Sequence, residues 1–294
     1  MKKQFWNTNQ CAVWIAAPSI ALALTFIITG VTNDWTFSRN GYWDLQDGWF
    51  TTLNAYLSVL PSSLWSNLTM LGDGSVLLPI LAPLIIWRRR YFFAVIASAP
   101  SAAIFSVIGK KVAGIPRPAA VLDHNTFNII GETLTSHNSF PSGHSITVFA
   151  ALVAIAASAY SNSKYISDSK IIWLTLMIAT VLGLSRIAVG AHWPLDVVAG
   201  ASLGWFAGLL GVAISRRSSA EWFYSIRGSR ILGLLLAALC YSLIQRGLAS
   251  SNANLPILWL SILCGLITSA YLLSQNKKGF SRYFMVYKNK ILEN

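Results

Sequence analysis

The sequence predicts an all-α integral membrane protein, a polytopic bundle of helices. Only 11% of the 294 residues are charged, against roughly 25% in an ordinary globular protein, and 54% are hydrophobic. A surface bathed in water needs more charge than this. Apolar runs of about 20 residues, long enough to cross a bilayer as a helix, also recur along the whole chain. These observations together exclude an ordinary soluble domain.

Eight transmembrane helices are expected from these runs. The first run follows Lys2 and Lys3, as the apolar region of a signal peptide would. It is longer than such a region, and no small-residue cleavage site follows it, so we expect it to be retained as a span. The predicted spans are 12–31, 68–87, 91–109, 145–160, 171–189, 197–215, 231–249 and 255–273.

Two longer polar segments separate some of the spans. Residues 32–67 carry many Trp, Tyr and Phe side chains, which favour the membrane interface, so we expect one or two helices lying on the outer leaflet. Residues 115–141 contain His124 and His137, which we expect to be loop residues, with contact to a lipid headgroup as the alternative. The chain then divides into a transmembrane core, 1–217, and a region, 218–294, of two more spans and a basic tail.

The distribution of basic residues predicts the orientation in the membrane. Lys and Arg accumulate in cytoplasmic loops, and most of the 22 fall on the side of the N-terminus. We therefore expect both termini in the cytoplasm, and the net charge of +12 mainly reflects this topology. No nucleic-acid motif accompanies the charges, so no nucleic-acid partner is expected. Six basic residues remain on the outer side: Arg39, Lys110, Lys111, Arg117, Arg186 and Arg246.

Several ionisable residues gather at the predicted outer ends of the spans. Charges at membrane helices are costly and are therefore functional candidates. Three cations, two histidines and one carboxylate at one depth suit a multiply charged anion, most obviously a phosphate. These residues are Lys110, Arg117, His144, Arg186, His192 and Asp196.

Residues 141–144, Pro-Ser-Gly-His, have the features of an anion site at the start of a helix. Ser142 is a suitable N-cap, and the first turn of a helix offers unpaired N–H groups to an anion. Gly143 would let an oxyanion approach the backbone closely. His144 would then stand at the rim of this site.

Residues 192–196, His-Trp-Pro-Leu-Asp, predict a paired histidine and carboxylate. Pro194 suits the first position of a helix, which would place Asp196 in its first turn. Four residues separate Asp196 from His192, close enough for a hydrogen bond to one ring nitrogen. Such a bond fixes the tautomer and leaves the other nitrogen free to attack, as in a catalytic triad.

Three segments together resemble the signature of the type 2 phosphatidic acid phosphatase family. They read K-x6-R-P from Lys110 to Pro118, P-S-G-H from Pro141 to His144, and S-R-x5-H-x3-D from Ser185 to Asp196. Each histidine alone could be an ordinary interfacial residue, but the complete set in this order is specific. The resemblance covers residues 64–215 and implies a six-helix phosphatase core, to which the last two spans would be an addition of unassigned purpose.

The resemblance implies a role for each residue of the signature. His192 would be the nucleophile, oriented by Asp196, and His144 would be the general acid and then the general base. The remaining positions would bind the phosphate oxygens as charge develops. These substrate-binding positions are Lys110, Arg117, Ser142, Gly143 and Arg186. No metal or cofactor is expected, and the sequence has no cage of carboxylates or clustered His and Cys ligands.

The expected activity is hydrolysis of lipid phosphates or pyrophosphates at the outer face of a bacterial inner membrane, through a phosphohistidine and without a metal. Undecaprenyl pyrophosphate is the preferred substrate, because an outward site suits recycling of that carrier. Phosphatidylglycerophosphate, phosphatidate and lipid A phosphates stay open. The alternatives are a phosphotransferase acting on a lipid acceptor such as lipid A, a vanadium-dependent haloperoxidase, and a lipid carrier without catalysis. The sequence does not indicate an oligomeric state.

Asp73 and the three cysteines lie outside this signature. Asp73, in the second predicted span, is interpreted either as the partner of a helix break or as an acid supporting Lys110 or Arg186. The cysteines lie in or beside apolar runs, so we expect buried thiols and no disulfide. They are Cys11, Cys240 and Cys264.

Overall fold

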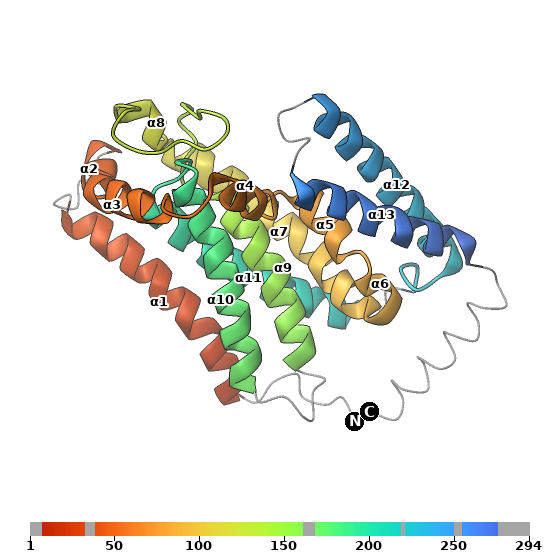
Figure 1. The fold of residues 1–294 in the computed structure, drawn as a ribbon. Coiled ribbons are helices and arrows are strands. Elements are labelled where there is room, and N and C mark those ends of the chain that lie inside the picture. Colours follow the sequence, from red (N-terminus) through yellow and green to blue (C-terminus); the bar gives the residue numbers. More distant parts are fainter. Residues whose placement is uncertain (1–7, 33–38, 161–167, 219–220, 250–254, 276–294) are drawn as a thin grey trace.

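The computed structural model describes residues 8–32, 39–160, 168–218, 221–249 and 255–275, and this part of the chain is a bundle of helices without strands (Figure 1). The predicted all-α membrane bundle is thereby confirmed. Seven helices are long: α1 (Thr8–Thr32), α7 (Arg89–Ala113), α9 (Gly143–Tyr160), α10 (Asp168–Ala188), α11 (Pro194–Arg217), α12 (Ile226–Ala249) and α13 (Pro256–Ser274).

Length and apolar composition identify which of the long helices can cross a membrane. In the described part of the chain, α7, α11, α12 and α13 are long and apolar enough. Helices α1, α9 and α10 carry shorter apolar stretches, Trp14–Thr29, Gly143–Ala159 and Trp173–Ala188. Each of the seven corresponds to one of the predicted spans.

The prediction of one continuous span at 68–87 is wrong. This segment is divided among the end of α4 (Ser62–Met70), α5 (Gly74–Leu81) and α6 (Leu84–Trp87). The Asp73 carboxylate accepts a hydrogen bond of 2.8 Å from the Ser75 N–H and so caps a new helix at this point. Pro83, which has no N–H to donate, lies between α5 and α6.

Short helices lie across the upper end of the bundle in Figure 1. They are α2 (Arg39–Asp44), α3 (Asp47–Leu57), α4 and α8 (Pro118–Val121). The described part of the segment 32–67 therefore forms α2, α3 and the first part of α4, joined by short turns, where one or two helices were expected. Residues 33–38 lie outside the described part. Two buried amides join this region to the start of α11 and the end of α10. Gln46 Oε1 accepts from the Leu195 N–H at 2.8 Å, and Asn54 Nδ2 donates to the Ile187 carbonyl at 2.9 Å.

Helix α11 lies at the centre of the bundle because glycines let its neighbours approach closely. A Cβ added at Gly200, Gly204 or Gly208 would lie 2.4–2.7 Å from a backbone carbonyl oxygen of Ser142, Ile146 or Ala150. Small residues at every fourth position allow this kind of contact between helix backbones in membranes. The close packing brings the start of α11 and the start of α9 together, and the Ser142 N–H donates to the Asp196 carbonyl at 3.0 Å.

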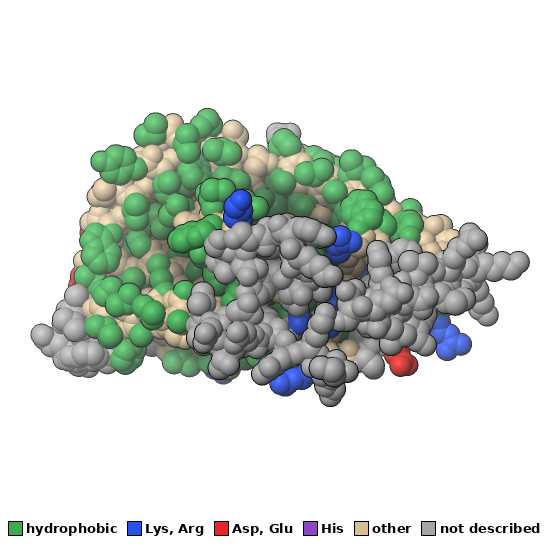
Figure 2. Space-filling view, turned by 90° about the horizontal axis from the view of Figure 1, so that it is seen from below, with side chains coloured by type: hydrophobic (Ala, Val, Ile, Leu, Met, Phe, Trp, Pro, Cys, Tyr) green, Lys and Arg blue, Asp and Glu red, His purple; other side chains and the backbone are tan. Residues whose placement is uncertain are grey.

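On the opposite face of the bundle, Figure 2 shows several Lys and Arg side chains among side chains that are mostly hydrophobic where the figure colours them. The exposed side chains Arg88, Arg217, Arg227 and Arg230 lie at the ends of α7, α11 and α12 on that side. Cys240 and Cys264 are free thiols, and the side chain of Cys11 lies outside the described residues.

Candidate active site

Four long helices bring the candidate residues to the same end of the bundle. Lys110 lies in the last turn of α7, His144 in the first turn of α9, Arg186 in the last turn of α10 and Asp196 in the first turn of α11. Antiparallel neighbours in a bundle place the end of one helix beside the start of the next. Residues separated by up to 86 positions therefore share one site.

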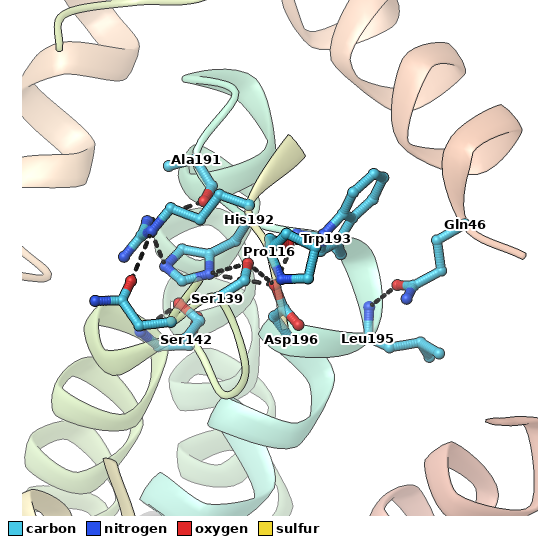
Figure 3. A network of polar contacts seen from close by, with 12 residues as sticks. Gln46, Pro116, Ser139, Ser142, Ala191, His192, Trp193, Leu195 and Asp196 are labelled. Atoms are coloured by element: carbon cyan, nitrogen blue, oxygen red, sulfur yellow. Dashed lines mark hydrogen bonds and ion pairs between the residues drawn. The ribbon is translucent and has the colours of Figure 1, made fainter. Parts of the chain in front are cut away.

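His192 and Asp196 form a buried pair at the centre of this site (Figure 3). The distance from His192 Nδ1 to Asp196 Oδ2 is 3.3 Å, and the two residues are 1% and 0% exposed. The other ring nitrogen, Nε2, lies 3.4 Å from Arg117 Nη1. A guanidinium can only donate, so Nε2 is the acceptor there and the ring proton belongs on Nδ1, facing the carboxylate. This tautomer directs the Nε2 lone pair into the site.

Two further residues, neither of them part of the sequence signature, fix the Asp196 carboxylate. The Tyr42 hydroxyl donates to Oδ1 at 2.7 Å, and the Ser139 hydroxyl donates to Oδ2 at 2.5 Å. The Trp193 N–H also donates to Oδ2, at 2.9 Å. A buried carboxylate needs such partners, because an unsatisfied charge in a low dielectric is costly. Tyr42 is 154 positions away in the chain, and no local pattern could have identified it.

Arg117 is held beside His192 by two connections, the one between α10 and α11 and the loop that follows α8. Its Nη1 donates to the Ala191 carbonyl at 3.0 Å, and its Nε donates to Asn138 Oδ1 at 3.1 Å. The guanidinium is thus oriented before any ligand arrives. It faces the His192 nitrogen on which a phosphoryl group would be carried.

Arg186 approaches the site from α10 and is 6% exposed. Its Nη1 donates to the Thr69 hydroxyl at the end of α4. Its buried Nε has no hydrogen-bond partner within the described part of the chain. A buried donor of this kind is expected to be satisfied by a ligand or a water, and a phosphate oxygen would serve.

Lys110 lies beside the start of α9, where Ser142 and Gly143 begin the helix. An added Cβ at Gly143 would lie 3.5 Å from Lys110 Nζ, so the ammonium lies beside the glycine backbone. Helix α9 begins at Gly143, and the Ser145 N–H donates to Ser142 Oγ at 3.4 Å. The free N–H groups of this first turn and the Lys110 charge are therefore available to the same anion.

His144 lies against the turn between α4 and α5. An added Cβ at Gly72 would lie 2.6 Å from both Cβ and Cδ2 of His144, so only glycine leaves room for the imidazole. His144 is partly exposed and lines a groove that continues away from the site. Its ring is thus open to a ligand entering from this groove.

The surroundings of His192 favour its neutral form. Burial, and then the charges of Arg186, Arg117 and Lys110, lower the pKa of His192 well below its ordinary value of 6.5. A lowered pKa means that the ring loses its proton at a more acidic pH, so His192 is neutral at pH 7. Tyr42 is affected in the opposite sense: burial and the Asp196 charge raise its pKa well above 10.0, so it stays a hydrogen-bond donor.

We predict that His192 titrates below pH 6.5 in the ligand-free protein. The measurement is ¹⁵N NMR of the protein labelled only at its 4 histidines, with the His192 signal assigned by its absence from His192→Ala. The ring should stay neutral as the pH falls through 6.5 and should gain its proton only in more acidic solution. A midpoint at or above 6.5 would contradict the electrostatic description of the site.

The other residues considered from sequence have different surroundings. His124 Nε2 lies 2.8 Å from the Ala119 carbonyl, and His124 and His137 are both exposed in the loop after α8. Asp73 pairs with Arg246 at 2.9 Å while it caps α5, so the helix-break interpretation describes its contacts. Among the described residues, no three His, Cys, Asp or Glu side chains form a group that could hold a metal ion.

The fold and the site together define a helical membrane protein with a buried His–Asp pair close to three cations. The sequence model of the PAP2 superfamily matches residues 89–220, which include every motif position. The chain is 30% identical to an undecaprenyl-diphosphatase of Sulfolobus acidocaldarius over 155 residues, which are 50% of this chain and 67% of the relative. This protein belongs to the PAP2 superfamily.

Two further comparisons extend this result. A lipid A 1-phosphatase of Rhizobium johnstonii is 33% identical over 135 residues, covering 44% of this chain and 49% of the relative, so the chain matches only about half of that protein. A PAP2-type phosphatidylglycerolphosphate phosphatase from Bacillus subtilis has a similar fold, with a TM-score of 0.50 at 19% identity over 69% of this chain and 98% of the other.

Proposed function

We propose that this protein is a phosphatase of membrane lipid phosphates, with lipid pyrophosphates of the undecaprenyl type as its preferred substrates. The observation that carries the proposal is the buried His192–Asp196 pair, with the unprotonated Nε2 facing Arg117 and two further cations in the same site. Relatives named for undecaprenyl diphosphate and for lipid A 1-phosphate support a lipid substrate.

The reaction would take place in two steps. His192 Nε2 attacks the terminal phosphorus, the bond from phosphorus to the leaving oxygen breaks, and His144 donates a proton to that oxygen. A water molecule then attacks the phosphohistidine, His144 takes its proton, and the P–N bond breaks to release phosphate. Lys110, Arg117 and Arg186 hold the three equatorial oxygens, whose charge changes in each transition state.

A groove beside His144 would hold the lipid chain. It has a volume of about 730 Å³, lies between α5, α7 and α9, and includes Gly143 and His144 among its lining residues. On α7 it is lined from Val95 to Val107, a helical length of roughly 18 Å, which is more than half of the hydrocarbon core of a bilayer. Its walls are mostly apolar, and the exposed Ala99 and Ala103 on α7 leave it open toward the lipid. One long chain attached to a headgroup at His144 fits this shape.

The proposed function is tested by phosphate release from a panel of purified lipid phosphates in detergent. The panel contains undecaprenyl pyrophosphate, phosphatidylglycerophosphate, phosphatidate and lipid A. We expect phosphate release that resists EDTA, is inhibited by vanadate, and is fastest with the pyrophosphate. Transfer of phosphate to added lipid A without free phosphate would instead identify a phosphotransferase. Lipid transport that survives His192→Ala would identify a carrier.

Filling the groove should change the chain-length preference. Ala103→Phe places a ring in the groove, where it would displace a few methylenes of the lipid chain. We therefore expect KM for the long-chain substrate to rise by about 10-fold. A short-chain analogue should be hydrolysed as before. Ile104 is the neighbouring exposed residue of α7 and does not line the groove, so Ile104→Phe is the matched control. Equal effects of the two substitutions would contradict the assignment of the groove.

A further inference from the structure

Helices α12 and α13 follow the part of the chain that the PAP2 superfamily model matches, yet they pack against α5, which begins beside the active site. In Figure 1 the pair lies beside α5, the helix that follows the turn packed against His144. A shared apolar cluster contains Val76 of α5, Cys240 and Leu243 of α12, and Leu258 and Ile262 of α13. An added Cβ at Gly265 would lie 2.9 Å from Pro79 Cβ, so α13 and α5 are in close contact.

Polar contacts tie α13 to the segment from α4 to α5. The Ile257 N–H donates to Asn67 Oδ1 at 3.1 Å, and the Ser261 hydroxyl donates to the Val76 carbonyl at 2.7 Å. These bonds fix the segment at points before and after the turn. The turn itself, residues 69–75, therefore has its two ends anchored to α13.

Arg246 of α12 closes the network at the turn. Its Nη1 donates to Asp73 Oδ2 at 2.9 Å and its Nη2 donates to Ser75 Oγ at 3.0 Å. Asp73 Oδ1 in turn accepts from Ser75 Oγ at 2.6 Å and from the Ser75 N–H at 2.8 Å. One guanidinium thus binds both side chains that begin α5. An isolated exposed ion pair contributes little to stability. Here the two hydrogen bonds from Arg246 and the Asp73 cap of α5 share the same two residues and form one connected network.

The 69–75 turn contacts two groups of the active site. Thr69 accepts a hydrogen bond from Arg186, and the backbone at Gly72 lies against the His144 imidazole. A displacement of the turn would therefore move the ring that serves as proton donor. A catalytic group displaced by roughly 1 Å can cost about 100-fold in rate.

We propose that α12 and α13 support the active site by anchoring the 69–75 turn, and that Arg246 is a positioning residue that holds this turn against His144. This inference rests on the proposed role of His144 in proton transfer. It gives the last two helices a function in catalysis, in addition to crossing the membrane.

The test measures kinetics and the His144 ring in the same variants of the full chain. Arg246→Ala should lower kcat by about 10-fold with little change in KM, because it misplaces a reacting group without removing a contact to substrate. It should also shift the His144 signal in NMR of histidine-labelled protein, assigned by its absence from His144→Ala. Arg246→Lys should restore part of kcat. Arg230, exposed on the same helix near its other end, provides the control: Arg230→Ala should change neither quantity.

A double-mutant comparison identifies the path of the effect. Asp73→Asn should reduce kcat as Arg246→Ala does. The kcat of the double variant should be no lower than that of the more damaging single variant, because both substitutions break the same contact. Additive losses, or wild-type kcat together with an unshifted His144 signal in Arg246→Ala, would overturn the inference. If Arg246→Ala does not fold, Arg246→Lys and Asp73→Asn supply the same comparison. If the wild-type protein releases no phosphate from any lipid, the proposed function fails, and the His144 signal still decides whether Arg246 positions the ring.

Discussion

His192→Ala is expected to abolish turnover, with a loss of at least about 10⁴-fold in kcat, because it removes the nitrogen that is proposed to carry the phosphoryl group. The cations would still bind substrate, so affinity for the lipid phosphate should fall much less than kcat. The measurement is phosphate release by the purified variant, together with trapping of a ³²P-labelled phosphoenzyme that is stable to alkali and labile to acid.

The control for His192→Ala is His124→Ala, which removes an exposed imidazole of the loop after α8. This variant should keep wild-type activity and the full yield of phosphoenzyme. Substantial phosphate release by purified His192→Ala protein would disprove the assignment of the nucleophile.

His144→Ala is expected to lower kcat on a lipid substrate by about 10²- to 10⁴-fold, the usual contribution of a general acid or base. Its two proposed tasks can be separated by the leaving group. p-Nitrophenolate needs little protonation, so p-nitrophenyl phosphate should still phosphorylate His192 in this variant. Hydrolysis of the phosphohistidine, which needs His144 as the base, should then be slow.

The expected observation for His144→Ala is a burst of one p-nitrophenol per protein, followed by slow release. Stopped-flow absorbance measures the burst, and a phosphoenzyme assay should find the protein mostly phosphorylated. A variant that is equally slow with both substrates and shows no burst would mean that His144 acts in binding. The proton given to the leaving oxygen would then have to come from another group.

The sequence predicted most of the fold because a membrane imposes strong local rules. Each apolar run must satisfy its own backbone hydrogen bonds, so a helix is the only solution for a single segment. This is why seven predicted spans correspond to helices. The exception, 68–87, is equally apolar, but Asp73 can cap a new helix and Pro83 interrupts the backbone ladder, and hydropathy does not measure either effect.

The candidate site was predictable where its residues are close in the sequence or lie at helix ends. The His192–Asp196 pair follows from a spacing of four residues. Lys110, His144 and Arg186 were expected at the same end of the bundle because successive helices alternate in direction. Tyr42, Ser139 and Thr69 were not predictable. They are ordinary polar residues whose importance comes only from hydrogen bonds to Asp196 and Arg186 across long separations in the chain.

The sequence by itself determined the helical membrane fold, the set of chemical groups, and the end of the bundle at which they meet, since all three depend on composition, period and spacing. Only the tertiary structure decided how these groups are held. The orientation of Asp196, the room for His144 at Gly72, and the link from Arg246 to the active-site turn depend on which helices touch. That choice is made by close packing of side chains distant in the sequence, and no local pattern encodes it.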